Sequence, residues 1–375
     1  MRSVQSLVLT MFLSLIVANH TAMAADACKR VNLLNRKWGQ FPRQMPLYNQ
    51  GSYGICYAYV ATQMVDFWRE THGGRIGKMK MAQSTPAFAA LLSRLTLIAN
   101  LKKANQRLST LAGGSIGFAL WGIRDMGMCK ANVIQESLDK FATQKGIDTN
   151  QFMMLLDKFF SEHRKNQSQM WGTGFVSESL RSLFGKPRAK GPDYEKLRQA
   201  MAPFLKGNEF TLFAHKVLKP CFDRRNIYLN SRKIPEYKFF ALNEDPLSYQ
   251  ERIGKLLTKP NAQPLGISYC ANVLTSSFAD ELRRKNNQVS IGPGCHLHSS
   301  MIVGQRTRRD KCQYLVRNTW GDKCKYAWPC LMRDGRAHGI WVAGKSLLRN
   351  INQIYYLPEG EAKAKPVSSI KKLIK

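Results

Sequence analysis

The chain has 375 residues, of which 44% are hydrophobic and 10% aromatic, and its 57 Lys+Arg against 25 Asp+Glu give a formal charge of +32. This hydrophobic content excludes a disordered chain, and no repeat of about 20 to 50 residues is visible, which excludes a solenoid. At roughly 150 residues per domain, the length allows two domains.

Residues 1–24 predict an export signal. Arg2 supplies the positive start, an apolar run follows, and Ala22 and Ala24 form a small-x-small cleavage site before a mature start near Ala25. We therefore expect a secreted protein, extracellular or periplasmic; an uncleaved anchor is the alternative. No later stretch predicts a transmembrane helix, so no membrane span is expected after signal removal.

The cysteines number nine, an odd count for a chain that enters an oxidising compartment. One is expected to be free, and the other eight can form four disulfides of open connectivity. Cys56 is the candidate free thiol, because it follows a Gly-rich turn and precedes a segment, residues 57–68, whose apolar spacing predicts a buried helix. Backbone N–H groups at a helix N-terminus favour a thiolate, although a small buried residue is the alternative reading.

A zinc site is a second reading of the cysteines. Cys295, His296 and His298 are close in sequence, but no second Cys or His pair at ligand spacing completes a set. We therefore predict no metal and no other cofactor.

Residues 50–59, Gln-Gly-Ser-Tyr-Gly-Ile-Cys-Tyr-Ala-Tyr, resemble the active-site segment of the papain family of cysteine peptidases, Gln-Gly-x-Cys-Gly-Ser-Cys-Trp-Ala-Phe. Tyr53 replaces the family's disulfide cysteine and Ile55 its serine, so one family disulfide is expected to be absent or rewired. Four further landmarks follow in the family's order. The first two are Gly113-Gly114, which borders the cleft in the family, and Gln263-Pro264, which opens a strand. The last two are Gly292-Pro293-Gly294-Cys295, followed by His298 six residues before Gly304, and Asn318-Thr319-Trp320-Gly321.

The resemblance implies a role for each site residue. Cys56 would attack the carbonyl carbon, and His298 would share its proton in a thiolate–imidazolium pair and then protonate the leaving amine. Asn318 would orient the imidazole, with Trp320 keeping water from that contact. The Gln50 side chain and the Cys56 backbone N–H would form the oxyanion hole.

Each of these residues also has an ordinary structural reading. Gln50 alone could be a polar loop residue, Asn318 a cap at a strand end and Trp320 a core aromatic. His296 would point the same way as His298 in one strand, and the distance to Gly304 favours His298.

The spacing departs from the family, because 298 − 56 = 242 residues separate Cys and His, against roughly 130 to 150. The extra chain falls between Gly114 and Gln263, and residues 151–160 carry a helical pattern. We predict a basic, mostly helical insertion that could occlude the cleft, narrow specificity or bind a partner. Only 56 − 25 = 31 residues precede Cys56 in the mature chain, so no long propeptide is expected.

The predicted fold class is α+β, since helices come first and strands later. Helices are expected near residues 56–70, 86–107 and 115–127, and strands near 265–270, 299–306, 312–318, 339–343 and 353–357. The resemblance implies a two-domain papain-like fold with a helical left domain and a β-barrel-like right domain. The predicted divisions are 1–24 (signal), 25–134 (left domain), 135–250 (insertion), 251–357 (right domain) and 358–375 (flexible basic tail).

The predicted function is a secreted cysteine endopeptidase that cleaves protein or peptide substrates through a covalent acyl-enzyme, most simply as a monomer. The charge also predicts attraction to anionic surfaces or polymers, but no motif for specific nucleic-acid binding is present. Two alternatives stay open: a catalytically inactive papain-like scaffold that binds partners, and a Cys/His amidase acting on isopeptides or wall peptides.

Overall fold

The computed structural model describes residues 28–35, 47–48, 50, 55–72, 86–100, 114–144, 199, 209–223, 226–229, 234–241, 249–275, 282–285, 288–291 and 295–359. Its helices are α3 (Cys56–His72), α4 (Pro86–Asn100), α5 (Ile116–Met126), α6 (Ala131–Thr143), α10 (Glu209–Leu218), α11 (Gln250–Thr258), α12 (Asn272–Thr275) and α13 (Gly344–Asn350), with 3-10 turns η1 (Leu33–Asn35) and η3 (Lys219–Phe222). Its strands are β1 (Val31–Asn32), β2 (Met128–Cys129), β3 (Ile227–Leu229), β4 (Lys238–Ala241), β5 (Leu265–Cys270), β6 (Leu282–Lys285), β7 (Gln288–Ile291), β8 (Leu297–Arg308), β9 (Lys311–Arg317), β10 (Cys330–Arg333), β11 (Arg336–Ala343) and β12 (Ile351–Tyr356).

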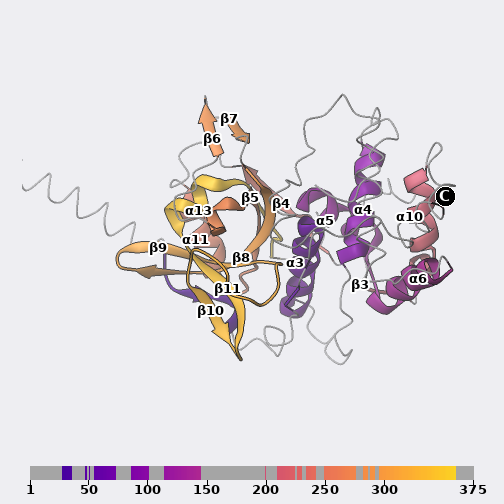
Figure 1. Cartoon of the computed structure of the whole chain (residues 1–375), viewed down its shortest axis with the longest axis horizontal. Coiled ribbons are helices and arrows are strands. Elements are labelled where there is room, and N and C mark those ends of the chain that lie inside the picture. Colours follow the sequence, from indigo (N-terminus) through magenta and orange to yellow (C-terminus); the bar gives the residue numbers. More distant parts are fainter. Residues whose placement is uncertain are drawn as a thin grey trace, which may run out of the picture.

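An antiparallel sheet forms one half of the molecule, on the left of Figure 1. Its order is β10-β11-β9-β8-β5-β12-β4, with β1 paired to β8. The central strand β8 is buried from His298 to Gln305, because it is flanked by β5 and β9 and covered by a helix. This strand therefore holds its side chains in fixed positions.

The helices α3, α4 and α5 lie beside the sheet, and α3 contacts β8 and β5 as well as both other helices (Figure 1). Helix α3 is buried around most of its circumference, as expected for a helix between a sheet and two helices. Close approach of α4 and α5 depends on Gly122, where a Cβ would lie 2.7 Å from the Leu92 Cβ. Helix α3 is therefore packed between strands β5 and β8 on one side and helices α4 and α5 on the other.

Four disulfides are present, Cys28–Cys312, Cys129–Cys221, Cys270–Cys295 and Cys324–Cys330, and Cys56 is free. This confirms the predicted pairing of eight cysteines. Such a set is typical of proteins in oxidising compartments and fits an extracellular protein. Cys295 is bonded to Cys270, so the zinc reading of the sequence near His298 is wrong at that cysteine.

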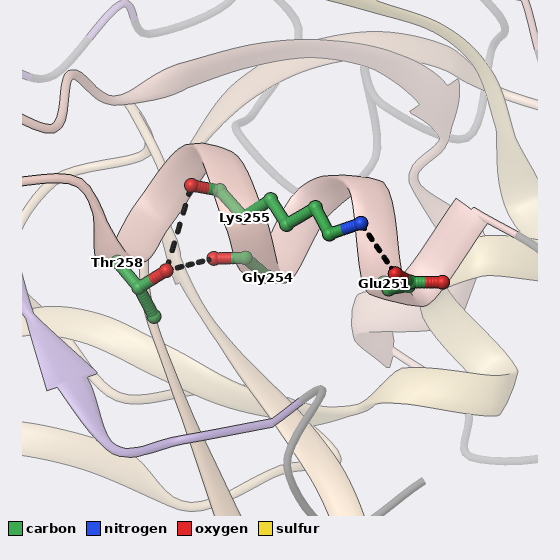
Figure 2. A network of polar contacts seen from close by, with 4 residues as sticks. All are labelled: Glu251, Gly254, Lys255 and Thr258. Atoms are coloured by element: carbon green, nitrogen blue, oxygen red, sulfur yellow. Dashed lines mark hydrogen bonds and ion pairs between the residues drawn. The ribbon is translucent and has the colours of Figure 1, made fainter. Parts of the chain in front are cut away.

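Helix α11 ends with a side chain that binds its own last turn. The Thr258 hydroxyl donates to the Gly254 carbonyl at 2.9 Å, and Lys255 pairs with Glu251 one turn back at 2.5 Å (Figure 2). The ion pair is solvent-exposed and contributes little, so the buried face of α11, with Ile253 and Leu257, holds the helix in place.

The predicted mixture of helices and antiparallel strands is confirmed, and each of the five predicted strands corresponds to an observed one with shifts of up to three residues at the ends. The expected helix at 86–107 is described as far as Asn100. Within 135–250, η3, which follows α10, is tied to β2 by the Cys129–Cys221 disulfide, and β4 joins the main sheet beside β12. The signal segment, the helical pattern at 151–160 and the tail beyond residue 359 lie outside the described residues. Within the described residues, no helix has the length and apolar character to cross a membrane.

Candidate active site

The free cysteine occupies the first residue of α3. The amides of Ala58 and Tyr59 donate to the Ile55 carbonyl at 2.9 and 3.3 Å, so the helix begins at Cys56 and its first backbone N–H groups have no carbonyl in the helix to bind. The amides of Cys56 and Tyr57 instead face the sulfur. Across from them, the sulfur contacts the backbone and hydroxyl of Ser299 on β8.

His298 lies one residue before this contact and is held by Asn318. The two are on neighbouring strands, because β8 pairs with β9 and Asn318 follows the last residue of β9. His298 Nε2 is 2.7 Å from Asn318 Oδ1. The Trp320 ring lies against the imidazole, with centroids 4.7 Å apart, and Tyr269 meets the imidazole edge-to-face at 5.8 Å. His298 is therefore 4% exposed, and both its position and one ring nitrogen are fixed.

Gln50 is fastened to the strand end that carries Asn318. Its backbone N–H donates to the Thr319 carbonyl at 2.8 Å, and the Thr319 hydroxyl donates to the Gln50 side-chain oxygen Oε1. Two residues further along, the Gly321 amide donates to the Tyr48 carbonyl at 3.2 Å. The bond from Thr319 anchors the Gln50 side-chain oxygen and so sets the direction of the side-chain amide group.

Gly114 sits directly on the aromatic ring of Tyr57, the residue after the cysteine. A Cβ at this position would lie 2.2 Å from Tyr57 Cζ, and the Tyr57 side chain is fully buried. Glycine is required here by close approach, and the segment that begins α5 is thereby set against the N-terminus of α3. Gly113 lies outside the described residues.

Burial controls the electrostatics of the cysteine and the histidine. Although Cys56 is only half-buried as a residue, desolvation raises the pKa of its thiol, and the hydrogen bonds of Ser299 and of the helix amides counter this in part. Desolvation lowers the pKa of His298 to about 4, against an opposing effect of the Asn318 hydrogen bond. Burial therefore disfavours the charged form of each group and opposes the thiolate–imidazolium pair that the resemblance implied.

Of the two neighbouring histidines, His298 is the one bound to Asn318. His296 precedes β8, where its backbone carbonyl accepts from the Ala271 amide at 2.8 Å and its N–H donates to Asn272 Oδ1 at 3.1 Å. Among the residues that the structure describes, no group of three His, Cys, Asp or Glu side chains could hold a metal ion.

The structure thus places Cys56 against Ser299, brings His298 into contact with Asn318 and Trp320, and ties Gln50 to Thr319. Sequence reasoning did not single out Ser299, Ser300, Thr319 or Tyr269. Alternation along a strand could have placed Ser300 on the face of His298, since the two residues are two positions apart. Tyr269 depends on the pairing register of β5 and β8, which sequence does not give.

No protein-family model matches the chain, and no curated protein matches it. Among solved structures, it is similar to procathepsin B S9 from Trypanosoma congolense, at 12% sequence identity and a TM-score of 0.39, over 88% of this chain and 78% of that chain.

Proposed function

We propose that this protein is a secreted, papain-like cysteine endopeptidase whose catalytic residues are Cys56, His298 and Asn318. The observation that carries the proposal is the placement of the free thiol. Cys56 begins α3 and contacts Ser299, and the preceding residue of that strand, His298, is bound through Nε2 by Asn318. A nucleophile, a base and a group that orients the base are the parts that acyl transfer needs. The motifs around residues 50–59 and 318–321 support the same assignment.

In the proposed mechanism the Cys56 proton moves to Nδ1 of His298 as the sulfur attacks the scissile carbonyl carbon. The carbonyl oxygen becomes an oxyanion, stabilised by the Cys56 backbone N–H and the Gln50 side-chain amide. The C–N bond then breaks, His298 returns the proton to the leaving amine, and a thioester remains on Cys56. Water, deprotonated by His298, attacks the thioester, and release of the carboxylic acid restores the thiol.

Because burial disfavours the charged forms of Cys56 and His298, the proposed first step is concerted, with proton transfer accompanying attack. Tyr269 and Trp320 contribute by enclosing the imidazole, which excludes water from its bond with Asn318. The papain-like division into a helical left domain, a β-rich right domain and an insertion over 135–250 belongs to this proposal, as does removal of the signal at residues 1–24. Substrates are proteins or peptides, and no cofactor has a role.

The first test is cleavage of a diverse peptide library by residues 25–375, read by mass spectrometry under mild reducing conditions. We expect cleavage that is lost in Cys56→Ala. Folded protein that cuts no peptide would refute the peptidase and favour an inactive binding scaffold. Cleavage confined to isopeptide or wall-peptide bonds would instead favour the amidase.

A second test concerns the Gln50 anchor. Thr319→Val keeps the buried volume but removes the hydroxyl that holds Gln50 Oε1, so we expect kcat to fall roughly tenfold with KM little changed, as for a weakened oxyanion donor. Thr62→Val is the matched control, since the fully buried Thr62 hydroxyl donates to the Ala58 carbonyl within α3. Equal kcat for the two variants would contradict the role of the anchor.

The β8–β9 hairpin supports a separate proposal about partners, the binding of a polyanion. Six basic residues gather on the hairpin and on the segment beside it, with Asp310 as the acid among them: Lys29, Arg30, Arg306, Arg308, Arg309 and Lys311. The Arg306 guanidinium carbon lies over the Trp341 ring at 4.0 Å from its centroid, and burial together with Arg308 and Arg30 lowers the pKa of Arg306. A surface whose cations repel one another gains by binding anions.

Retention on immobilised heparin, eluted with a salt gradient, tests this surface. Arg308→Glu with Arg309→Glu should elute at clearly lower salt than Lys216→Glu with Lys219→Glu, which makes the same charge change on exposed residues of α10 and η3. Elution of both pairs at the same salt would mean that net charge alone governs binding.

A further inference from the structure

The side-chain oxygen of Asn318 accepts three hydrogen bonds. Its donors are His298 Nε2 at 2.7 Å, the Thr319 backbone N–H at 2.8 Å and the Ser300 hydroxyl at 3.1 Å. An amide oxygen has two lone pairs and ordinarily accepts fewer than three hydrogen bonds. This concentration of donors fixes which end of the Asn318 amide faces the histidine.

The directions of these bonds follow from the groups involved. A backbone N–H only donates, so Thr319 requires oxygen, and not the amide nitrogen, at the position of Asn318 Oδ1. Since that oxygen only accepts, His298 Nε2 must carry a proton. In the neutral imidazole the lone pair is then on Nδ1, which is the nitrogen that the proposed mechanism uses as the base.

Behind Ser300 lies a second hydroxyl, that of Tyr269. The Tyr269 and Ser300 oxygens are 3.0 Å apart, and both residues are fully buried. Because the Ser300 proton is directed to Asn318, Tyr269 is the donor in this pair. Residue 300 follows His298 by two positions on β8, and Tyr269 is the register partner of His298 on β5, so the hydroxyl chain lies on the face of the sheet that carries the imidazole.

We propose that Ser300 and Tyr269 are positioning residues for the site, and that their chain of hydroxyl groups holds the Asn318 amide so that His298 keeps its proton on Nε2. Neither residue touches the substrate. The expected effect on turnover rests on the proposed peptidase activity, whereas the fixed imidazole proton is a property of the folded protein that is measurable without any substrate.

Two variants remove one hydroxyl each, Ser300→Ala and Tyr269→Phe. In imidazole nitrogen–proton NMR spectra of wild-type protein we expect His298 with its proton on Nε2. Solvent exchange of this proton should speed up roughly tenfold in Ser300→Ala and less in Tyr269→Phe, where Ser300 still donates. Turnover should follow the same order, with a roughly tenfold loss of kcat in Ser300→Ala, the factor for one hydrogen bond of about 1.4 kcal/mol, and KM within about twofold.

Matched controls exist for both variants. Tyr314 is fully buried on β9, and its hydroxyl has no hydrogen-bond partner among the described residues, so Tyr314→Phe makes the same chemical change outside the chain of hydroxyls. Ser93→Ala removes a buried serine hydroxyl on α4. Neither control should alter the exchange of the His298 proton or kcat.

The double variant Ser300→Ala with Tyr269→Phe separates positioning from stability. Ser300→Ala alone leaves the buried Tyr269 hydroxyl without its acceptor, which destabilises the fold, and removing that hydroxyl relieves the penalty. We therefore expect the double variant to melt above Ser300→Ala while its kcat stays as low. Recovery of kcat together with the melting temperature would assign Ser300 a structural role only and overturn the proposal.

The experiment also distinguishes this inference from the peptidase proposal. A wild-type protein that cuts no peptide refutes the peptidase, and the NMR measurements still decide the role of the hydroxyls. A His298 proton on Nδ1, or an exchange rate unchanged in folded Ser300→Ala and Tyr269→Phe, would overturn the inference even if cleavage is observed.

Discussion

The environment of His298 predicts a pH-dependent stability that can be measured without a substrate. The pKa of His298 is lowered from 6.5 to about 4 in the folded protein, chiefly because burial disfavours the imidazolium. The unfolded chain binds a proton at this residue below pH 6.5, whereas the folded chain resists protonation until about pH 4. The free energy of unfolding should therefore fall as pH drops through this range.

The size of the effect follows from the two pKa values. With 6.5 unfolded and about 4 folded, this one group should remove about 2 kcal/mol of stability between pH 7.5 and pH 5, and about 3 kcal/mol by pH 4. His298→Gln cannot titrate and lacks this contribution. The difference in unfolding free energy between wild type and His298→Gln should therefore shrink by about 2 kcal/mol between pH 7.5 and pH 5.

Urea unfolding of both proteins at several pH values, followed by tryptophan fluorescence, measures that difference. Contributions from other titrating groups cancel in the comparison, because they are common to both proteins. A difference that stays constant to within about 0.5 kcal/mol from pH 7.5 to pH 5 would refute the reasoning. It would mean that His298 is protonated as readily in the folded site as in the unfolded chain.

Two further predictions concern Cys56 and Gly114. Alkylation of Cys56 by iodoacetamide should be slow at pH 7, and its rate should rise with pH beyond 9.0, because burial raises the pKa of this thiol above that ordinary value. A rate that is already maximal near pH 5 would reveal a thiolate–imidazolium pair instead. Gly114→Ala should lower the free energy of unfolding by about 3 kcal/mol or more, since its Cβ would lie 2.2 Å from the rigid, buried Tyr57 ring. Gly266→Ala should lower that free energy by less, because the nearest contact of its Cβ is the flexible Met64 sulfur at 2.7 Å. Denaturant unfolding of the two alanine variants tests this ordering, and equal losses would contradict it.

The arrangement of Cys56 and His298 explains how burial and helix geometry compete in one site. The sequence predicted that the N-terminus of α3 would favour a thiolate, and the amides of Cys56 and Tyr57 do act in that direction. Desolvation is nevertheless the larger influence, because α3 begins against the buried strand β8. Residue type and helix position were visible in the sequence, but the depth of the sulfur was not.

The disulfides show a similar division. An odd number of cysteines and the surroundings of Cys56 predicted one free thiol and four bonds, and this is what the structure contains. The pairing itself depends on distance in space. Cys28 and Cys312 are 284 residues apart in sequence, yet β1 lies beside β8 and thereby brings them together.

The sequence by itself determined the order of helices and strands, because apolar periodicity and turn residues act locally, and it singled out Cys56, His298 and Asn318 through motifs that carry their chemistry. Only the tertiary structure decided what surrounds them. Strand pairing brought Tyr269 opposite His298, and the end of β9 set Asn318 within reach of the Ser300 hydroxyl. Register, burial and hydrogen-bond direction are properties of segments that meet in space, and no local pattern encodes them.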